Sequence, residues 1–160
     1  MLQLTIKRLC EPNEKANACA AILSALPQWF GIPEANASYI EHVRNIVFFA
    51  VAYDWDKAIG FIALETGTDA AEIHVMGVLP EYHRQGIGRQ LVQRCEEYCI
   101  ARKIAVTTVK TLGPAHPDAG YARTRAFYEG MGFEAVRVTE EWGKGCPCLH
   151  MAKRLKGGNP

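Results

Sequence analysis

Two glycines one residue apart, Gly86 and Gly88, stand at the start of a predicted helix in the stretch EYHRQGIGRQL (81–91). Amides at the start of a helix have no partner within it and carry the positive end of the helix dipole, so they stabilise an anion. Glycines let a ligand approach the main chain closely, and Arg84 and Arg89 add positive charge. The stretch is therefore predicted to bind a phosphate or pyrophosphate.

Two common phosphate loops do not fit this turn. A Walker loop needs a lysine and then Ser or Thr after its last glycine, whereas GRQ follows here. A dinucleotide-binding fingerprint needs a third glycine at position 91, which is leucine. The two glycines alone are also compatible with a tight connection between a strand and a helix that binds no ligand.

The strand predicted before the turn, AEIHVMGV (71–78), carries polar residues that a central strand does not need for packing. Because side chains alternate along a strand, Glu72, His74, Met76 and Val78 are expected on one face. A carboxylate and an imidazole can each accept a proton. Glu72 and His74 are therefore candidate general bases, and a structural polar contact is the alternative for each.

The hydrophobic pattern predicts one α/β domain that positions these residues. Strands are predicted over residues 2–9, 46–53, 58–65, 71–78, 103–111, 133–138 and 146–155, and helices within 13–26, 34–45, 87–101 and 121–132. This order favours a mixed sheet flanked by about four helices. The domain is predicted to span residues 1–156, and residues 157–160 are expected to be a flexible tail.

The composition argues against two classes of partner, nucleic acid and membranes. The chain has 160 residues, of which 49% are hydrophobic and 22% charged, and its formal net charge is +1. A nearly neutral chain has no overall electrostatic attraction to nucleic acid or to an anionic membrane. No signal peptide or membrane-spanning stretch is evident, so the six cysteines are expected to be reduced thiols in a cytoplasmic protein.

Three residues near the C-terminus raise the question of a metal. Cys146, Cys148 and His150 alternate along a predicted strand, so they would share a face and zinc binding is conceivable. Structural zinc sites usually show paired clusters of ligands, and no fourth ligand is evident here. We therefore predict no metal.

Two stretches resemble a known family. MGVLPEYHRQGIGRQLV is similar to motif A of the GCN5-related N-acetyltransferases (GNAT), in which a strand passes through a proline turn into Q/R-x-x-G-x-G/A and a helix. TRAFYEGMGFEAV resembles a later motif of the same family, and the order of the elements agrees over nearly the whole chain. One departure is His83, which stands at the first position of the Q/R-x-x-G-x-G/A pattern.

The resemblance implies a GNAT fold, with a mostly antiparallel sheet of six or seven strands splayed between the fourth and fifth. It implies acetyl-CoA as co-substrate and no metal, with the diphosphate held by amides of the turn and the pantetheine arm beside the fourth strand. The amide of Val78 would polarise the thioester carbonyl. The positions that the resemblance assigns to the cofactor are Met76, Val78, His83, Arg84, Gln85, Gly86, Ile87, Gly88, Arg89 and Tyr121.

The resemblance also implies catalytic roles. Glu72 matches the general base of the histone-acetylating members, and Tyr128 in AFYEGMGF matches the general acid. A phenol with a pKa of about 10 can protonate a thiolate whose thiol has a pKa of about 8.5; the alternative for Tyr128 is an aromatic packed on a helix face. There are two departures: Tyr121 replaces an asparagine that touches the cofactor in many members, and Lys110 replaces a catalytic glutamate of the ribosomal-protein-acetylating members.

The expected acceptor is a primary amine of a small molecule or peptide. Trp29, Phe30 and Trp142 are candidates for an apolar wall of the acceptor site, and Asp118, Glu140 and Glu141 are candidates to attract a cation. Alternatively, the aromatic residues seal the core and the acids are solvated. The sequence does not distinguish a monomer from a homodimer.

Three other functions compete with an acetyltransferase. A non-catalytic acyl-CoA-binding module would use the glycine turn to bind the cofactor but would not transfer the acyl group. An acyltransferase of the same fold could use a different acyl-CoA donor. A nucleotide-binding enzyme is the weakest alternative, because the chain lacks the required lysine and third glycine.

Overall fold

A seven-stranded sheet forms the centre of the protein in a computed structural model, which describes residues 1–156. The strands are β1 (Leu4–Arg8), β2 (Phe48–Asp54), β3 (Lys57–Thr66), β4 (Ala70–Val78), β5 (Val106–Leu112), β6 (Glu134–Thr139) and β7 (Cys148–Arg154). The α-helices are α1 (Pro12–Ser24), α2 (Pro33–His42), α3 (Ile87–Ala101) and α4 (Ala119–Gly130), and two 3₁₀ turns span Val43–Asn45 and Pro80–Tyr82.

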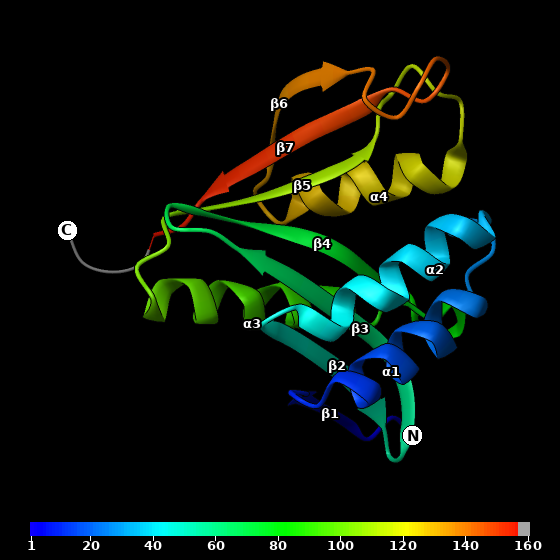
Figure 1. Ribbon diagram of the computed structural model, residues 1–160, viewed down its shortest axis with the longest axis vertical. Coiled ribbons are helices and arrows are strands. Elements are labelled where there is room, and N and C mark those ends of the chain that lie inside the picture. Colours follow the sequence, from blue (N-terminus) through cyan, green and yellow to red (C-terminus); the bar gives the residue numbers. More distant parts are fainter. Residues whose placement is uncertain (157–160) are drawn as a thin grey trace.

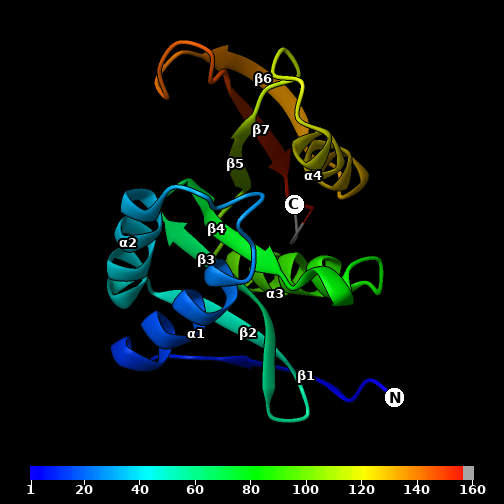
Figure 2. The same cartoon turned by 90° about the vertical axis from the view of Figure 1, so that its right-hand side faces the viewer.

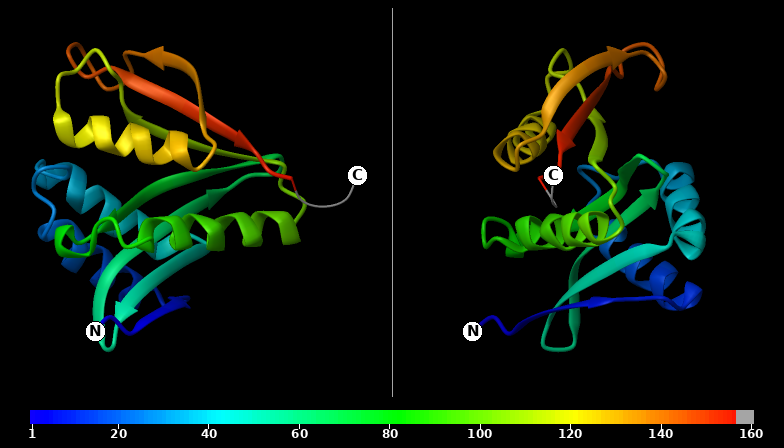
Figure 3. Two further views of the ribbon diagram at one scale, coloured as in Figure 1. Left: turned by 180° about the vertical axis from the view of Figure 1, so that it is seen from behind. Right: turned by 90° about the vertical axis from the view of Figure 1, so that its left-hand side faces the viewer.

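The sheet is mixed, in the order β1-β2-β3-β4-β5-β7-β6. Every neighbouring pair is antiparallel except β4 and β5, which are parallel. The helices form layers on both faces: α1 and α2 lie on one side of β3 and β4, and α3 lies on the other (Figure 2). Helix α4 packs on β5 on the same side as α3, as the views from behind and from the side also show (Figure 3). The predicted fold class is confirmed.

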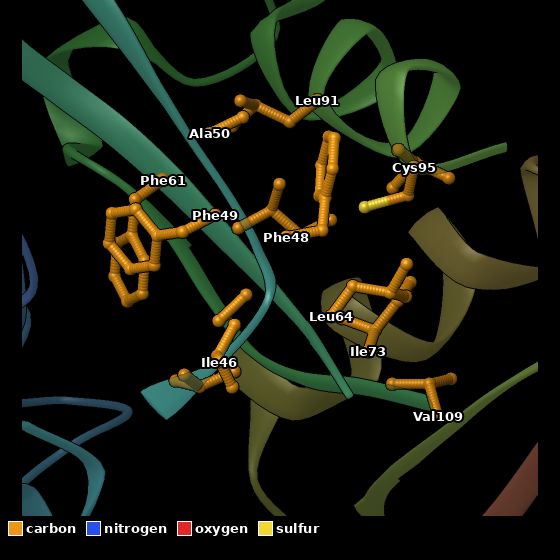
Figure 4. Packing of buried hydrophobic residues seen from close by; sticks show 14 of the residues in the cluster. Ile46, Phe48, Phe49, Ala50, Phe61, Leu64, Ile73, Leu91, Cys95 and Val109 are labelled. Atoms are coloured by element: carbon orange, nitrogen blue, oxygen red, sulfur yellow. The ribbon is translucent and has the colours of Figure 1, made fainter. Parts of the chain in front are cut away.

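Strand β2 is buried on both faces, which explains its unbroken apolar sequence. The Phe49 ring stacks on Phe61 of β3, with centroids 5.4 Å apart, while the Phe48 ring faces Tyr98 of α3 at 4.7 Å. Figure 4 shows the first pair on one side of the strands and Phe48, with Leu91, on the other. Burying each such side chain stabilises the fold by roughly 1.5–3 kcal/mol. The core therefore packs against both faces of β2 and ties it to β3 and α3.

Helix α1 approaches β4 closely because of a glycine in the strand. A Cβ built on Gly77 would lie 2.7 Å from Cδ1 of Leu26 and 3.5 Å from Cγ2 of Ile22. The helix begins after Glu11, whose carboxylate accepts hydrogen bonds from the amides of Asn13 and Glu14. Because Gly77 has no side chain, α1 and the residues after it can pack closely against β4, the strand that precedes the glycine turn.

Strands β4 and β5 separate along their length (Figure 1). Their last registered pair is Ile73 with Val109, so residues 74–78 of β4 have no partner strand on that side. Strand β5 instead continues beside β7, up to the pair Leu112 and Cys148. The resulting splay opens toward the turn that begins α3.

Residues 157–160, predicted to be a flexible tail, lie outside the described residues. Within residues 1–156, no helix combines the length and the apolar character that crossing a membrane requires.

Candidate active site

The turn between β4 and α3 leaves a run of main-chain amides unpaired. Among residues 1–156, no protein acceptor bonds to the amides of residues 84–89, and the first bond of the helix runs from the amide of Gln90 to the carbonyl of Gly86 at 3.1 Å. Arg84 and Gly86 have φ values of 63° and 81°. Left-handed residues within such a turn point successive amides toward a common side. The structure therefore has the free amides that the glycine pattern predicted.

Gly88 allows α3 and α4 to come together beside this turn. A Cβ at this position would lie 3.2 Å from two ring atoms of Phe127 in α4 and 3.8 Å from Cε of Met76 in β4. The two glycines thus differ in purpose. Gly86 supplies a left-handed backbone, and Gly88 supplies space.

The end of β4 turns its main chain into the splay. The amide of Leu79 donates to the carbonyl of Ile59 in β3 at 2.8 Å. Since main-chain groups alternate in direction along an antiparallel strand, the amide and carbonyl of Val78 point away from β3. Nε2 of His83 bonds to that carbonyl at 2.7 Å, and its ring packs edge-on against Trp29 at 5.7 Å. The amide of Val78 is left facing the splay.

The prediction that Glu72, His74, Met76 and Val78 share a face is wrong. The register passes from Ala63↔Val75 directly to Leu64↔Ile73, so His74 is an extra residue in β4. Such a bulge reverses the alternation of side chains on its two sides. A sequence pattern with period two cannot show where an extra residue is inserted.

The contacts on either side of the bulge show the reversal. Met76 lies on the α3 side, next to Gly88. His74 lies on the α2 side, where its ring centroid is 5.6 Å from that of Tyr39 and 4.3 Å from that of His42. The candidate base at position 74 therefore belongs to the face of the sheet opposite the side chain of Met76.

The surroundings of His74 favour the neutral form of its imidazole. Burial is the largest cause that lowers its pKa below the ordinary histidine value, and the charge of His42 acts in the same direction. Nε2 of His42 is itself 3.3 Å from Oε1 of Glu65. A neutral imidazole can accept a proton, so His74 is chemically suited to act as a base at neutral pH.

Glu72, the second candidate base, belongs to a charged network on the same face. Its Oε2 is 3.8 Å from Nζ of Lys110, which is 3.1 Å from Oε2 of Glu141. The hydrogen bond to Glu141 is the main cause that raises the pKa of Lys110. Oε1 of Glu141 contacts Nε2 of His150 at 2.9 Å. These residues line a cavity of about 480 Å³ between β4, β5, β7 and the middle of β6.

Tyr128 lies on the other side of the sheet. It is 5% exposed, and its ring packs edge-on against Phe133 at 5.6 Å. Burial raises the pKa of its phenol far above the ordinary value, and Cys95 of α3 and Tyr121 add to the shift. Tyr128 therefore stays protonated at neutral pH between α3 and α4.

Tyr121 connects α4 to the segment between α1 and α2. Its hydroxyl donates to the carbonyl of Trp29 at 2.7 Å, and burial is the main cause that raises its pKa to about 12. Asp118, which the sequence offered as a group that attracts a cation, instead caps α4 by accepting a bond from the amide of Tyr121 at 3.1 Å. The cofactor contacts assigned to Tyr121 and His83 by resemblance stay predictions.

The profile of the Acetyltransferase (GNAT) domain matches residues 45–135, which include the bulged strand, the glycine turn and Tyr128. The chain belongs to the GNAT acetyltransferase family. A comparison with curated proteins found no match. The match to the family ends at residue 135, so it includes neither β7 nor the connection that precedes it.

Solved GNAT structures share this fold. The ribosomal-protein-S18-alanine N-acetyltransferase from Escherichia coli has a TM-score of 0.77 at 19% identity, with 98% of this chain and 97% of that chain covered. The aminoglycoside 6'-N-acetyltransferase from Enterococcus faecium has a TM-score of 0.75 at 20% identity, covering 98% and 99%. The PaiA N-acetyltransferase from Thermoplasma acidophilum, in complex with coenzyme A, has a TM-score of 0.71 at 18% identity, covering 96% and 99%.

The GNAT motifs did not predict the residues around His74. Tyr39 and His42 are three positions apart on α2, which places them on one helix face, and that spacing could have indicated a shared contact. Of the candidate wall residues, Phe30 packs edge-on against Tyr39 at 6.0 Å. Glu140 and Trp142 are exposed and do not line the cavity.

Proposed function

We propose that this protein transfers an acetyl group directly from acetyl-CoA to the primary amine of a small molecule or peptide. The observation that carries the proposal is the run of unpaired amides at residues 84–89, beside a splay into which the amide of Val78 points. Membership of the GNAT family and the coenzyme A complex of a protein with the same fold support it.

The residues of the turn fit the diphosphate of coenzyme A. Unpaired amides and a helix N-terminus stabilise an anion without a dedicated side chain. Nothing in the protein lies within 4 Å of the position a Cβ would take on Gly86, so the main chain can be approached there. When bound, acetyl-CoA supplies an activated acetyl thioester. The amide of Val78 would donate to the carbonyl oxygen on which negative charge develops.

Candidate acid and base groups come from opposite faces of the sheet. Glu72 and His74 lie on the α2 face, with the cavity, and Tyr128 lies between α3 and α4. A direct transfer needs a base for the entering amine and an acid for the departing thiolate. We assign the amine to the cavity side, with Glu72 or His74 as its base, and assign protonation of the thiolate to Tyr128.

The cavity suits an amine of modest size. Its volume of about 480 Å³ lies within the usual range for small-molecule sites. The carboxylates of Glu72 and Glu141 offer partners for a cation, while Lys110 limits their combined negative charge. The solved proteins with this fold are named for acceptors of both kinds, an alanine of a ribosomal protein and an aminoglycoside.

The test is a panel of amines incubated with acetyl-CoA and the purified protein, with release of the coenzyme A thiol followed over time. The panel contains small polyamines, amino sugars and short peptides with a free N-terminus. Calorimetry with coenzyme A measures binding separately from turnover. Thiol release that requires one class of amine supports the proposal.

Two other outcomes would point to the competing functions. Binding of coenzyme A without turnover on any amine would favour an acyl-CoA-binding module. Preference for succinyl-CoA or a long-chain acyl-CoA in a donor competition would favour a different acyltransferase. Failure to bind coenzyme A at all would overturn the proposal.

A further inference from the structure

Three potential metal ligands meet beside the cavity, where β7 begins. They are Glu141, from the connection between β6 and β7, and Cys148 and His150, which alternate on one face of β7. Their ligating atoms all lie within 4.8 Å of one another. We infer that Glu141, Cys148 and His150 form a binding site for a zinc-type divalent transition-metal ion.

The distances suit such an ion without rearrangement of the main chain. In tetrahedral zinc sites the metal lies about 2.0 Å from nitrogen and oxygen and about 2.3 Å from sulfur, which separates the ligand atoms by roughly 3.3–3.6 Å. Nε2 of His150 is 3.7 Å from Sγ of Cys148 and 2.9 Å from Oε1 of Glu141. For these two pairs, shifts of a few tenths of an ångström in side chains would give the spacing of a zinc site.

The arrangement differs from a catalytic relay of cysteine, histidine and acid. In a relay the acid bonds to one ring nitrogen of histidine while the nucleophile faces the other. Here both Cys148 and Glu141 lie at the same nitrogen, Nε2 of His150. Three donor atoms that converge on one point are suited to a shared ion, because an ion can accept all three at once.

Neighbouring groups hold Glu141 in a suitable orientation. Oε2 contacts Nζ of Lys110 at 3.1 Å, while Oε1, the oxygen nearest His150, accepts from the hydroxyl of Thr139 at 2.8 Å. The lysine therefore occupies the oxygen that the metal would not need. Such outer contacts commonly orient a coordinating carboxylate.

This inference reverses the prediction of no metal from the sequence. That prediction considered Cys146 with Cys148 and His150, and Cys146 is exposed and outside the cluster. The third ligand, Glu141, comes from seven positions before Cys148, across the connection between two strands. Three protein ligands leave one coordination position, as in zinc sites that also bind water or a substrate. Glu141 and His150 line the cavity, so that position opens toward it.

The test is a titration of the chelator-treated, reduced full-length protein with Co²⁺, which replaces zinc and absorbs light. We expect saturation near one equivalent, intense visible bands from tetrahedral coordination, and a near-ultraviolet band from thiolate bonding. Added Zn²⁺ should abolish all of these bands by competition.

Three variants locate the ion. Glu141→Gln should weaken Co²⁺ binding about tenfold or more, since even a lost outer contact commonly costs that much. Cys148→Ser should weaken it similarly and remove the thiolate band. Cys146→Ser is the matched control and should bind like the wild type, because that cysteine lies outside the cluster. Glu141 is exposed, so its variant keeps the test valid if Cys148→Ser fails to fold.

Absence of binding by the wild type, or equal binding by the wild type and Glu141→Gln, would overturn the inference. The titration contains neither acetyl-CoA nor an amine. Its outcome is therefore independent of whether the proposed acetyl transfer is correct.

Discussion

The two sides of the splay between β4 and β5 are built in different ways. On the α3 side, the turn at residues 84–89 offers main-chain amides, and its construction depends on two glycines separated by one residue. On the α2 side, the cavity and its surroundings consist of residues from β4, β5, α2, β6, β7 and the β6–β7 connection. A site made from main chain tolerates changes in neighbouring side chains, whereas a site made from side chains can change with each one.

This difference suits an enzyme family with one donor and many acceptors. In the proposed function, the turn on the α3 side is the donor side and needs one geometry to hold a diphosphate, which a short motif can specify. The acceptor side can vary without disturbing that motif, because its residues come from other segments. Four predictions test this division.

Removal of the Tyr128 hydroxyl should have the largest effect. Tyr128→Phe preserves the buried ring but removes the proposed proton donor, so kcat should fall by about 10²–10⁴-fold with little change in the affinity for coenzyme A. Steady-state kinetics and calorimetry measure the two quantities. Tyr53→Phe, on β2 away from the splay, is the control. Intact turnover in Tyr128→Phe would mean that the departing thiolate is protonated by another group.

The two candidate bases can be separated by their pH dependence. For the true base, Glu72→Gln or His74→Gln should lower kcat/KM by about 10²-fold and remove the acidic limb of its pH profile. If His74 is the base, that limb in the wild type should lie below the ordinary histidine pKa, because burial lowers the pKa of His74. The other variant should keep the limb. If the acidic limb of the pH profile were unchanged in both variants, neither Glu72 nor His74 would be the general base.

Gly86→Ala should weaken the donor side specifically. The left-handed backbone at φ 81° costs a residue with a Cβ about 1–2 kcal/mol, so the turn would relax and the amides would diverge. We expect the affinity for coenzyme A to fall about tenfold, which corresponds to about 1.4 kcal/mol. Gly130→Ala, where an added Cβ also meets nothing within 4 Å, is the control. If Gly86→Ala and Gly130→Ala bound coenzyme A with equal affinity, the geometry of the turn would not contribute to cofactor binding.

The same contrast explains how much the sequence could reveal. The apolar run of β2 and the repeat of α3 are local, so the strands and helices were predictable. The glycine turn was predictable for the same reason. The bulge at His74 was not, because it depends on how β3 registers with β4. The approach of Glu141 to His150 was also hidden, since it depends on the path of the β6–β7 connection.

The smallest predicted effect concerns the neighbour of His74. His42 lowers the pKa of His74 by its charge, and a phenylalanine would keep a ring over His74 without that charge. His42→Phe should therefore raise the pKa of His74. A base acts in its unprotonated form, so activity is lost as the pH falls through this pKa. If His74 is the base, the acidic limb of kcat/KM should move to higher pH in His42→Phe, while the rate on the plateau stays the same. A limb that moves to lower pH, or a plateau that collapses, would show that His42 acts on the reaction by some other means than its charge on His74.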